Sequence, residues 1–504
     1  DEKRADKILR CPEHLATAEK IAEKSIVLLK NDGLLPLRKD LRSVAVIGPA
    51  ADTVSYGDYT ETRGRKGGVS VLDGIRAAVS PETEVLYERG CNFLGQALHP
   101  FDPSMLRDEN GEAGLTGRYY NGPVPQGEPV QIRTDRTVNF NWIFALPHPA
   151  LDANCFSVVW TGSVVMPRTM DGCIGLSTQD SMRLYVDDKL LIDGWGKEKS
   201  ADQALDFHFE AGRAYKIRIE FVNDRRGARV IFGYSAGREN FPAAVEAARK
   251  ADIAILCMGD NEETCGENFD RTDLNLPGRQ LELVQAVYAT GTPVVLVLQS
   301  GRPVTANWEN DHLPAILEAW FPGEQGGTAI AKTLFGDAAP GGRLPITFPR
   351  SVGQIPCHYS RRPGGGKRYV EMDWLPLYPF GYGLTYTTFA YRDMALSRSV
   401  IDPQDTVTVS VTVTNTGKYT GDAVPQLYVR DMFSSVVKPE RQLAAFRRLT
   451  LAPGESRRVE LTIGPKQLRT LGPDYVWRVE PGKFELQLGD NAENILLRAD
   501  LTVE

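Results

Sequence analysis

A short, wholly apolar run decides the fold of this chain: Ile253-Ala254-Ile255-Leu256-Cys257-Met258, followed at once by Gly259-Asp260. A continuous apolar run of this length is typical of a strand that is buried on both faces in a parallel sheet. The pattern recurs at 44–47, 294–298 and 315–320, and residues 280–289 have helical character between two of these runs. Strands that alternate with helices predict a doubly wound α/β sandwich.

Helices are expected on either side of this sheet. From Glu13 to Lys30, apolar residues recur at helical spacing until Asn31-Asp32-Gly33 ends the pattern, which predicts an amphipathic helix over 13–30. Residues 241–250 predict another helix, which returns the chain to the sheet before Asp252.

Two β-rich regions complete the organisation. From about 115 to 235 the helical periodicity gives way to short alternating strands, so we expect an all-β domain inserted in the α/β sandwich. A Gly- and Pro-rich aromatic stretch at 362–389 leads into a strict alternation at 406–413, which predicts an immunoglobulin-like β-sandwich. The predicted segments are 1–112 and 239–362 for the α/β sandwich, 113–238 for the insert, 363–392 for the linker and 393–504 for the last domain.

Composition excludes several function classes. At 504 residues the chain is too long for one hydrophobic core, and 24% charged with 42% hydrophobic residues is typical of a globular protein. The net charge of -7 is well mixed, and without a long basic run we expect no nucleic-acid partner. No apolar run approaches the roughly 20 residues that cross a bilayer, so no membrane partner is expected. The first residues lack the apolar core of a signal peptide, but the compartment stays open.

Metal and cofactor sites are not expected either. The seven cysteines are scattered without CxxC spacing, and the six histidines show no paired spacing, so free thiols and structural histidines are the simplest interpretation. The glycine-rich turns at 48–51 and 323–327 lack the spacing of a dinucleotide or phosphate loop.

The segment after the apolar run at 253–258 is the most informative. It carries closely spaced carboxylates: Asp260, Glu262, Glu263, Glu267 and Asp270. In an open α/β sheet, the loops beyond the carboxyl ends of the strands are where ligands usually bind. Acidic loop residues are most often merely solvated, and that interpretation is kept for Glu262 and Glu263.

Here a family resemblance becomes specific. The pattern Glu267-x-x-Asp270-Arg271, then Leu274-x-Leu276-Pro277-Gly278-x-Gln280, resembles the loop that supplies the general acid/base in family 3 β-glucosidases. The stretches 25–31, 340–345 and 378–386 resemble the same family. The insert resembles a protective-antigen-type domain, although the two adjacent aspartates of that pattern are replaced by Gln179-Asp180, and the last domain resembles a fibronectin-type-III-like domain.

The resemblance implies roles for residues of the acidic loop. It assigns the general acid/base to Glu267, with Glu263 as the fallback, and makes Phe269, Asp270 and Arg271 candidates for substrate binding. An Asp270–Arg271 pair would hold the loop and leave Glu267 free. Phe269 and Trp308 could stack on sugars, although aromatic residues in such a fold are more often core. The aromatic residues at 378–389 are interpreted as a structural belt.

The resemblance also implies an activity. It predicts an exo-acting retaining glycoside hydrolase that releases terminal β-D-glucose from β-linked oligosaccharides or aryl and alkyl glucosides. The nucleophile of such enzymes lies in an N-terminal (β/α)₈ barrel, and no run of eight strand–helix units occurs here, so the chain is expected to need a barrel domain or chain as partner. A β-xylosidase or another β-glycosidase, a non-catalytic carbohydrate-binding module and a homo-oligomer stay open alternatives.

Overall fold

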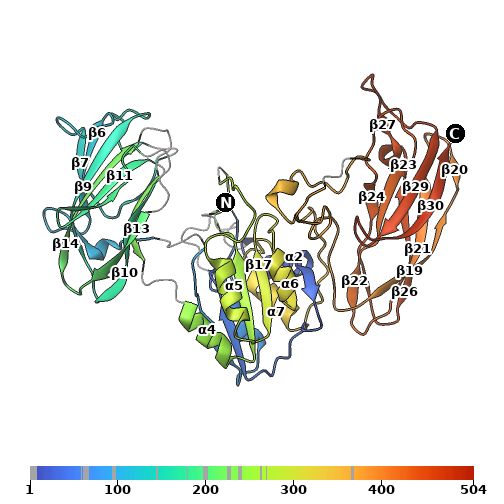
Figure 1. Cartoon of the computed structure of the whole chain (residues 1–504), viewed down its shortest axis with the longest axis horizontal. Coiled ribbons are helices and arrows are strands. Elements are labelled where there is room, and N and C mark those ends of the chain that lie inside the picture. The colour runs from blue at the N-terminus through green and yellow to red at the C-terminus, as the bar shows by residue number, and fades with distance from the viewer. Residues whose placement is uncertain are drawn as a thin grey trace. The chain divides into compact units, whose positions relative to one another are not determined.

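The computed structural model describes residues 8–57, 59–60, 67–93, 98–142, 146–178, 180–196, 203–223, 229–235, 241–261, 264–267, 269–364 and 368–504. The chain forms two compact units: residues 1–93 together with 241–504, and residues 94–240. Within the described ranges, no helix is both long and apolar enough to span a bilayer. The elements of each unit are labelled in Figure 1.

A six-stranded sheet with the order β1-β18-β17-β16-β2-β3 forms the centre of the first unit. Five strands pair in parallel, and β1 at one edge runs antiparallel to β18. The parallel α/β sheet expected from the apolar runs is therefore present. The strands are β1 (Val27–Asn31), β2 (Ser43–Ile47), β3 (Glu84–Glu88), β16 (Ile253–Gly259), β17 (Val294–Gln299) and β18 (Ala315–Glu318).

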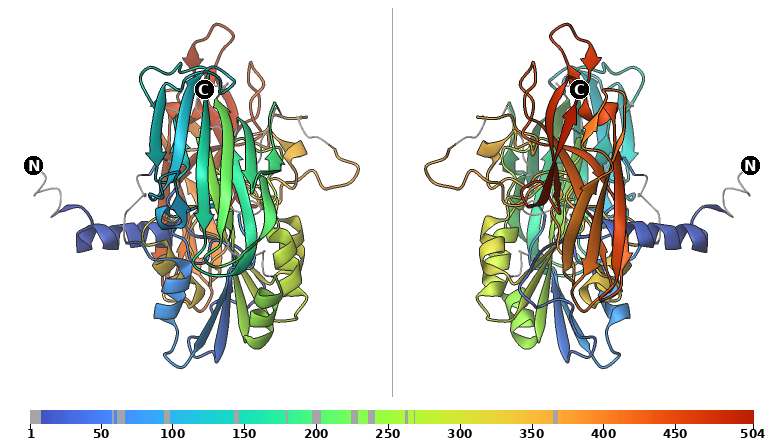
Figure 2. Two further views of the ribbon diagram at one scale, coloured as in Figure 1. Left: turned by 90° about the vertical axis from the view of Figure 1, so that its left-hand side faces the viewer. Right: turned by 90° about the vertical axis from the view of Figure 1, so that its right-hand side faces the viewer.

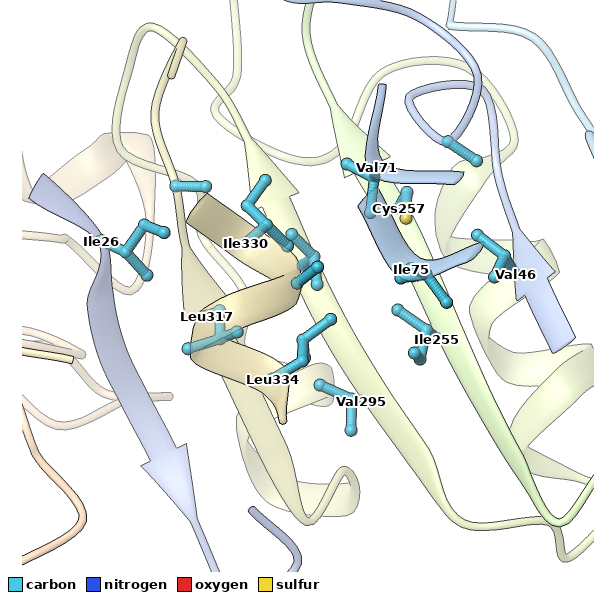
Figure 3. Packing of buried hydrophobic residues seen from close by; sticks show 14 of the residues in the cluster. Ile26, Val46, Val71, Ile75, Ile255, Cys257, Val295, Leu317, Ile330 and Leu334 are labelled. Atoms are coloured by element: carbon cyan, nitrogen blue, oxygen red, sulfur yellow. The ribbon is translucent and has the colours of Figure 1, made fainter. Parts of the chain in front are cut away.

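Helices cover both faces of this sheet, which is why its central strands are apolar at every position. Alternate residues of β16 enter two separate cores, Ile255 and Cys257 in one, Leu256 and Met258 in the other. Figure 3 shows the first core, in which Ile75 of α3 and Ile330 of α7 face the sheet. The helices of the first core are α2 (Pro12–Ser25), α3 (Val71–Ala78) and α7 (Gly326–Leu334), and those of the second are α4 (Phe241–Lys250), α5 (Gln280–Tyr288) and α6 (Asn307–His312).

The helix predicted over 13–30 is wrong after Ser25. Helix α2 ends at Ser25, and residues 27–31 form the edge strand β1, which pairs with β18. Val27, Leu28 and Leu29 are all buried, so this segment has apolar contacts on both faces and cannot form an amphipathic helix surface. A run with apolar neighbours at every position fits the helical and the buried-strand pattern equally well, and the sheet edge decides between them.

The second unit consists of two antiparallel sheets around a core of aromatic and aliphatic side chains. Its long strands run side by side in the left view of Figure 2. Segments before the predicted boundary at 113 belong to it, because β4 pairs with β15 and β5 pairs with β9. The strands are β4 (His99–Pro100), β5 (Leu106–Arg107), β6 (Leu115–Asn121), β7 (Gln131–Asp135), β8 (Asn139–Asn141), β9 (Phe156–Val165), β10 (Met170–Thr178), β11 (Ser181–Val186), β12 (Lys189–Asp193), β13 (Gln203–Phe209), β14 (Ala214–Asn223) and β15 (Arg229–Ser235).

A β-sandwich ends the chain. One sheet has the order β19-β21-β26 and the other β20-β30-β29-β23-β24, and inward-facing residues such as Val409 and Leu486 form its core. Strand β21 has a strictly alternating burial pattern, as its sequence predicts. The strands are β19 (Phe389–Leu396), β20 (Val400–Ile401), β21 (Val407–Asn415), β22 (Gly421–Ala423), β23 (Gln426–Asp431), β24 (Gln442–Phe446), β25 (Leu449–Leu451), β26 (Ser456–Ile463), β27 (Thr470–Leu471), β28 (Trp477–Arg478), β29 (Gly482–Gly489) and β30 (Ile495–Val503), with a short helix α8 (Pro465–Leu468).

Tyrosines of the linker anchor it to the α/β sandwich. The hydroxyl of Tyr378 donates to Asn310 Oδ1 (2.7 Å), that of Tyr382 to the Leu29 carbonyl (3.0 Å) and that of Tyr386 to the Thr333 carbonyl (2.6 Å). These contacts agree with the interpretation of this stretch as a structural belt.

Candidate active site

The candidate site lies at the carboxyl edge of the parallel sheet, where the acidic loop leaves β16. The last residue of β16, Gly259, has φ +140°, and a Cβ atom on it would lie 1.9 Å from the carbonyl oxygen of Gln299. Only glycine allows this close approach of β16 to β17. The loop therefore starts directly above the neighbouring strand, at the edge where ligands bind in open α/β sheets.

A buried amide closes the base of the acidic loop. Gln280, the first residue of α5, is fully buried; its Oε1 accepts from the Gly259 N–H (2.8 Å) and its Nε2 donates to the Gly259 carbonyl (2.9 Å). One side chain thus satisfies both backbone groups of the residue at which the loop begins. The glutamine of the Leu-x-Leu-Pro-Gly-x-Gln pattern has a structural task.

Asp260, the first carboxylate of the loop, is 1% exposed and is bound from three sides. Ser300 Oγ donates to Asp260 Oδ2 (2.6 Å), Arg271 Nη1 donates to Oδ1 (3.2 Å), and Arg302 Nε lies 3.8 Å from Oδ2. A buried carboxylate is tolerated only with such partners. Asp260 is therefore a structural anion that ties the loop to the end of β17.

Two arginines hold the rest of the loop. Arg302 Nη2 donates to the backbone carbonyls of Thr264 (3.1 Å) and Phe269 (3.3 Å), which lie on either side of Glu267. Arg271 reaches the Asn275 carbonyl (2.7 Å) in addition to Asp260. The loop is consequently held by guanidinium groups at several points of its backbone, and charge-assisted hydrogen bonds are the stronger kind.

Glu267 itself is exposed and accepts a hydrogen bond from the hydroxyl of Tyr59. Tyr59 belongs to the loop after β2, 208 residues earlier in the chain, and its φ is +59°. Sequence reasoning missed this contact, because no local pattern links two loops so distant in sequence. Loops that follow parallel strands lie at the same edge of the sheet, and this general rule is the signal that could have brought Tyr59 and Glu267 together.

The other predicted residues of the loop differ in their exposure and in their contacts. Phe269 is half-buried and Asp270 is exposed. The Asp270–Arg271 pair is not formed: Arg271 is turned inward to Asp260 and also lies 3.3 Å from Asp273. Consecutive side chains in an extended loop point in different directions, which explains the change of partner. The fallback Glu263 and its neighbour Glu262 lie outside the described residues.

A second buried carboxyl lies at the same edge. Glu318 ends β18, is fully buried, and accepts a hydrogen bond from the Trp320 N–H (2.8 Å) through Oε1, whereas its Oε2 has no hydrogen-bond partner among the described residues. Burial raises the pKa of Glu318 well above the usual value; the Trp320 amide opposes this rise, and the charge of Asp260 adds to it. Sequence reasoning missed this residue, because it ends an apolar strand.

Trp308 lies away from these contacts, on helix α6. Its ring stacks on His312 with centroids 4.3 Å apart and meets Tyr288 edge-on at 5.4 Å. It packs against the second core of the sheet as a partly buried side chain. Across the part of the chain that the structure describes, no three His, Cys, Asp or Glu side chains come together as metal ligands would.

Comparison with known proteins identifies families and relatives that this chain matches. Residues 26–386 match the model of the glycosyl hydrolase family 3 C-terminal domain, and residues 423–492 match a fibronectin type III-like domain. The chain is 34% identical over 535 residues to a β-glucosidase of Rhizobium radiobacter, covering 99% of this chain and 63% of that protein. It is 46% identical over 302 residues to a β-xylosidase of Formosa agariphila, covering 58% of this chain and 42% of that protein.

A solved structure agrees in fold. The crystal structure of a β-glucosidase from Kluyveromyces marxianus superimposes with a TM-score of 0.77 at 28% identity, covering 98% of this chain and 63% of that one. The chain thus spans about three fifths of the length of the relatives that match nearly all of it.

Replacing Gln280 tests the base of the loop. In Gln280→Ala, the N–H and C=O of Gly259 lose their partners inside the protein, and each orphaned group costs about 1–3 kcal/mol. We expect the free energy of unfolding, measured by urea denaturation, to fall by about 2–5 kcal/mol. Gln285→Ala, on the same helix, is the matched control and should fall by less than about 1 kcal/mol. Equal losses in the two variants would contradict the clamp.

Glu318 gives a prediction on pH. Its folded-state pKa is raised, so above the ordinary glutamate pKa the folded protein retains a proton that the unfolded chain releases. Stability from this group is complete at low pH and is lost, by up to about 1.4 kcal/mol per pH unit, as pH rises toward the folded pKa. Glu318→Gln mimics the protonated form and removes this loss.

The measurement is urea denaturation from pH 5 to pH 9. The difference in free energy of unfolding between Glu318→Gln and the original chain should grow in favour of the variant as pH rises. Glu84→Gln, at an exposed strand position, is the control and should run parallel to the original chain. A constant difference for Glu318→Gln would show that this carboxyl does not hold its proton.

Proposed function

This chain belongs to glycosyl hydrolase family 3, and we propose that the complete protein is an exo-acting retaining glycoside hydrolase that releases terminal β-D-glucose from short β-glucosides. The single observation that carries the proposal is the acidic loop. It presents the exposed Glu267 on a backbone fixed by Gln280 and Arg302 at the carboxyl edge of the sheet.

Glu267 is the general acid/base of the proposed reaction. Retaining glycosidases use two carboxyl groups about 5 to 5.5 Å apart, one as nucleophile and one as proton donor and acceptor. The carboxyl of Glu267 gives its proton to the glycosidic oxygen as the bond to the anomeric carbon breaks. The carboxylate then takes a proton from the water that releases the sugar. The Tyr59 hydroxyl, which donates to Glu267, orients the carboxylate between these two steps.

Two nearby carboxylates among the described residues are bound elsewhere, which supports this choice. Asp260 is buried among Ser300, Arg271 and Arg302, so it cannot reach a substrate. Asp273 lies against Arg271. Phe269 and Asp270 are placed next to Glu267 in the loop and are proposed to contact the leaving group of the substrate.

The nucleophile is proposed to come from a (β/α)₈ barrel outside this chain. The parallel strands among the described residues form one open sheet, and none of the described carboxylates at its carboxyl edge is proposed as the nucleophile. The substrate would bind between the barrel and this edge. A β-xyloside is the second candidate substrate, because a β-xylosidase shares 46% identity with part of this chain.

Substitution of Glu267 tests the acid/base assignment in the complete protein. In Glu267→Ala, hydrolysis of cellobiose should fall by about 10²–10⁴-fold, because its poor leaving group needs a proton. Activated aryl glucosides should keep more of their rate, and azide should restore part of the loss by replacing water in the second step. Asp270→Asn is the control that changes a loop carboxylate without removing Glu267. Unchanged cellobiose hydrolysis in Glu267→Ala would refute the assignment.

The division between two domains is tested by mixing. The 504-residue chain alone should bind sugars without hydrolysing 4-nitrophenyl β-D-glucoside, and addition of a barrel domain from the same protein should restore turnover. A carbohydrate-binding module with a decorative acidic loop would show the same sugar binding with and without the barrel and no turnover in either case.

A further inference from the structure

A cavity of about 350 Å³ is formed by the segment before the linker, by the first part of the linker and by Glu493 of the β-sandwich. The lining residues before Glu493 are Thr347, Gln354, 356–362, Tyr369, Trp374, Pro376, Pro379 and Phe380. This volume falls in the range of pockets that hold small molecules. None of the described loop residues around Glu267 takes part in it.

Hydrogen bonds within the protein hold the walls of this pocket in place without a ligand. Gln354 is 4% exposed, its Nε2 donates to the Trp374 carbonyl (3.2 Å), and its Oε1 accepts from the Arg350 N–H (2.6 Å). The Tyr369 hydroxyl donates to the Gly353 carbonyl (3.0 Å). These bonds hold the two halves of the segment together, so a ligand would not have to order the walls when it binds.

Flat aromatic rings form part of the lining. Tyr359 stacks on Phe380 with centroids 4.2 Å apart, which fixes both rings. Arg361 lies over Trp374 at 4.5 Å from the ring centroid, and Trp374 is still 41% exposed. An exposed indole held in place by its neighbours offers an apolar surface to the C–H face of a ring.

The polar lining includes two guanidinium groups, Arg361 and Arg362, and one carboxylate, Glu493. Arg361 is paired, because its Nη1 donates to Glu493 (3.0 Å) and its Nε lies 3.7 Å from Glu440. Arg362 is exposed and has no hydrogen-bond or ion-pair partner among the described residues. The pocket therefore keeps one uncompensated positive charge, next to the hydroxyl of Ser360 and the ring of His358.

We propose that this pocket binds a uronic acid residue, a sugar ring that carries a carboxylate. The ring stacks on Trp374, the carboxylate pairs with Arg362, and the sugar hydroxyls hydrogen-bond to Ser360 and His358. A neutral sugar would leave the guanidinium group without an anion, and a phosphate would leave the aromatic surface unused. An aromatic acid would lack hydroxyls for the polar wall. The proposal does not depend on the role of Glu267, and the test measures binding without turnover.

Isothermal titration of the 504-residue chain tests this proposal with four probes: methyl β-D-glucuronide, methyl β-D-glucoside, benzoate and acetate. The glucuronide should bind at least about ten-fold more tightly than each of the others, because only it satisfies the ring and the charge together. Arg362→Gln and Trp374→Ala should each weaken glucuronide binding by about ten-fold or more.

Arg392→Gln is the matched control. Arg392 is exposed on strand β19, in the sheet β19-β21-β26, and this variant should bind as the original chain does. Circular dichroism of each variant establishes that it is folded, and Arg362→Lys distinguishes a lost charge from a disturbed wall, since it should recover part of the affinity. Equal binding of glucuronide and glucoside would overturn the proposal. So would equal binding of benzoate, binding no tighter than acetate, or an Arg362→Gln variant with unchanged affinity.

Discussion

The arrangement of the candidate site depends on the buried amide of Gln280, which binds both backbone groups of Gly259. Gly259 is the point where β16 ends against β17, and no side chain could occupy that position without meeting the backbone of Gln299. With the base of the loop fixed in this way, Asp260 enters the interior and gathers Ser300, Arg271 and Arg302 around it. Arg302 in turn holds the backbone on both sides of Glu267. The backbone that carries the exposed Glu267 is thus held by the contacts of Gln280, Asp260 and Arg302.

Two buried carboxyl groups lie at this edge, and their surroundings differ. Asp260 is surrounded by two guanidinium groups and a hydroxyl, which compensate a negative charge. No ion pair to Glu318 occurs among the described residues, and burial together with the charge of Asp260 raises its pKa. A second anion so close to the first would be costly in a medium of low dielectric constant. The edge of the sheet therefore combines a carboxylate with two guanidinium partners and a carboxyl whose pKa is raised by burial.

Much of the fold follows from the sequence, and the exceptions have identifiable causes. The parallel strands were predictable because β2, β16 and β17 are apolar throughout, and β21 because it alternates strictly. The sequence predicts a helix where β1 lies, because the apolar run Val27-Leu28-Leu29 has no polar position that would distinguish helical from strand periodicity. At the site, the motif indicated Glu267 and the position of the loop. The partner of Arg271 could not be predicted, because the conformation of the loop selects Asp260 over the adjacent Asp270. The contact of Tyr59 and the raised pKa of Glu318 could not be predicted either, because they depend on segments far apart in sequence.

The division of the proposed catalytic groups between two domains explains why the loop needs such extensive support. A proton donor must lie within hydrogen-bond reach of the glycosidic oxygen, and a misplacement of about 1 Å can cost about a hundred-fold in rate. If the nucleophile belongs to a barrel, the docking of two domains sets the distance between the two carboxyl groups, and a flexible acid loop would add its own error to that of the docking. Gln280, Asp260 and Arg302 remove this second source of error before the domains meet. If the nucleophile belongs to a barrel, the position of that barrel would be the variable that is left to set.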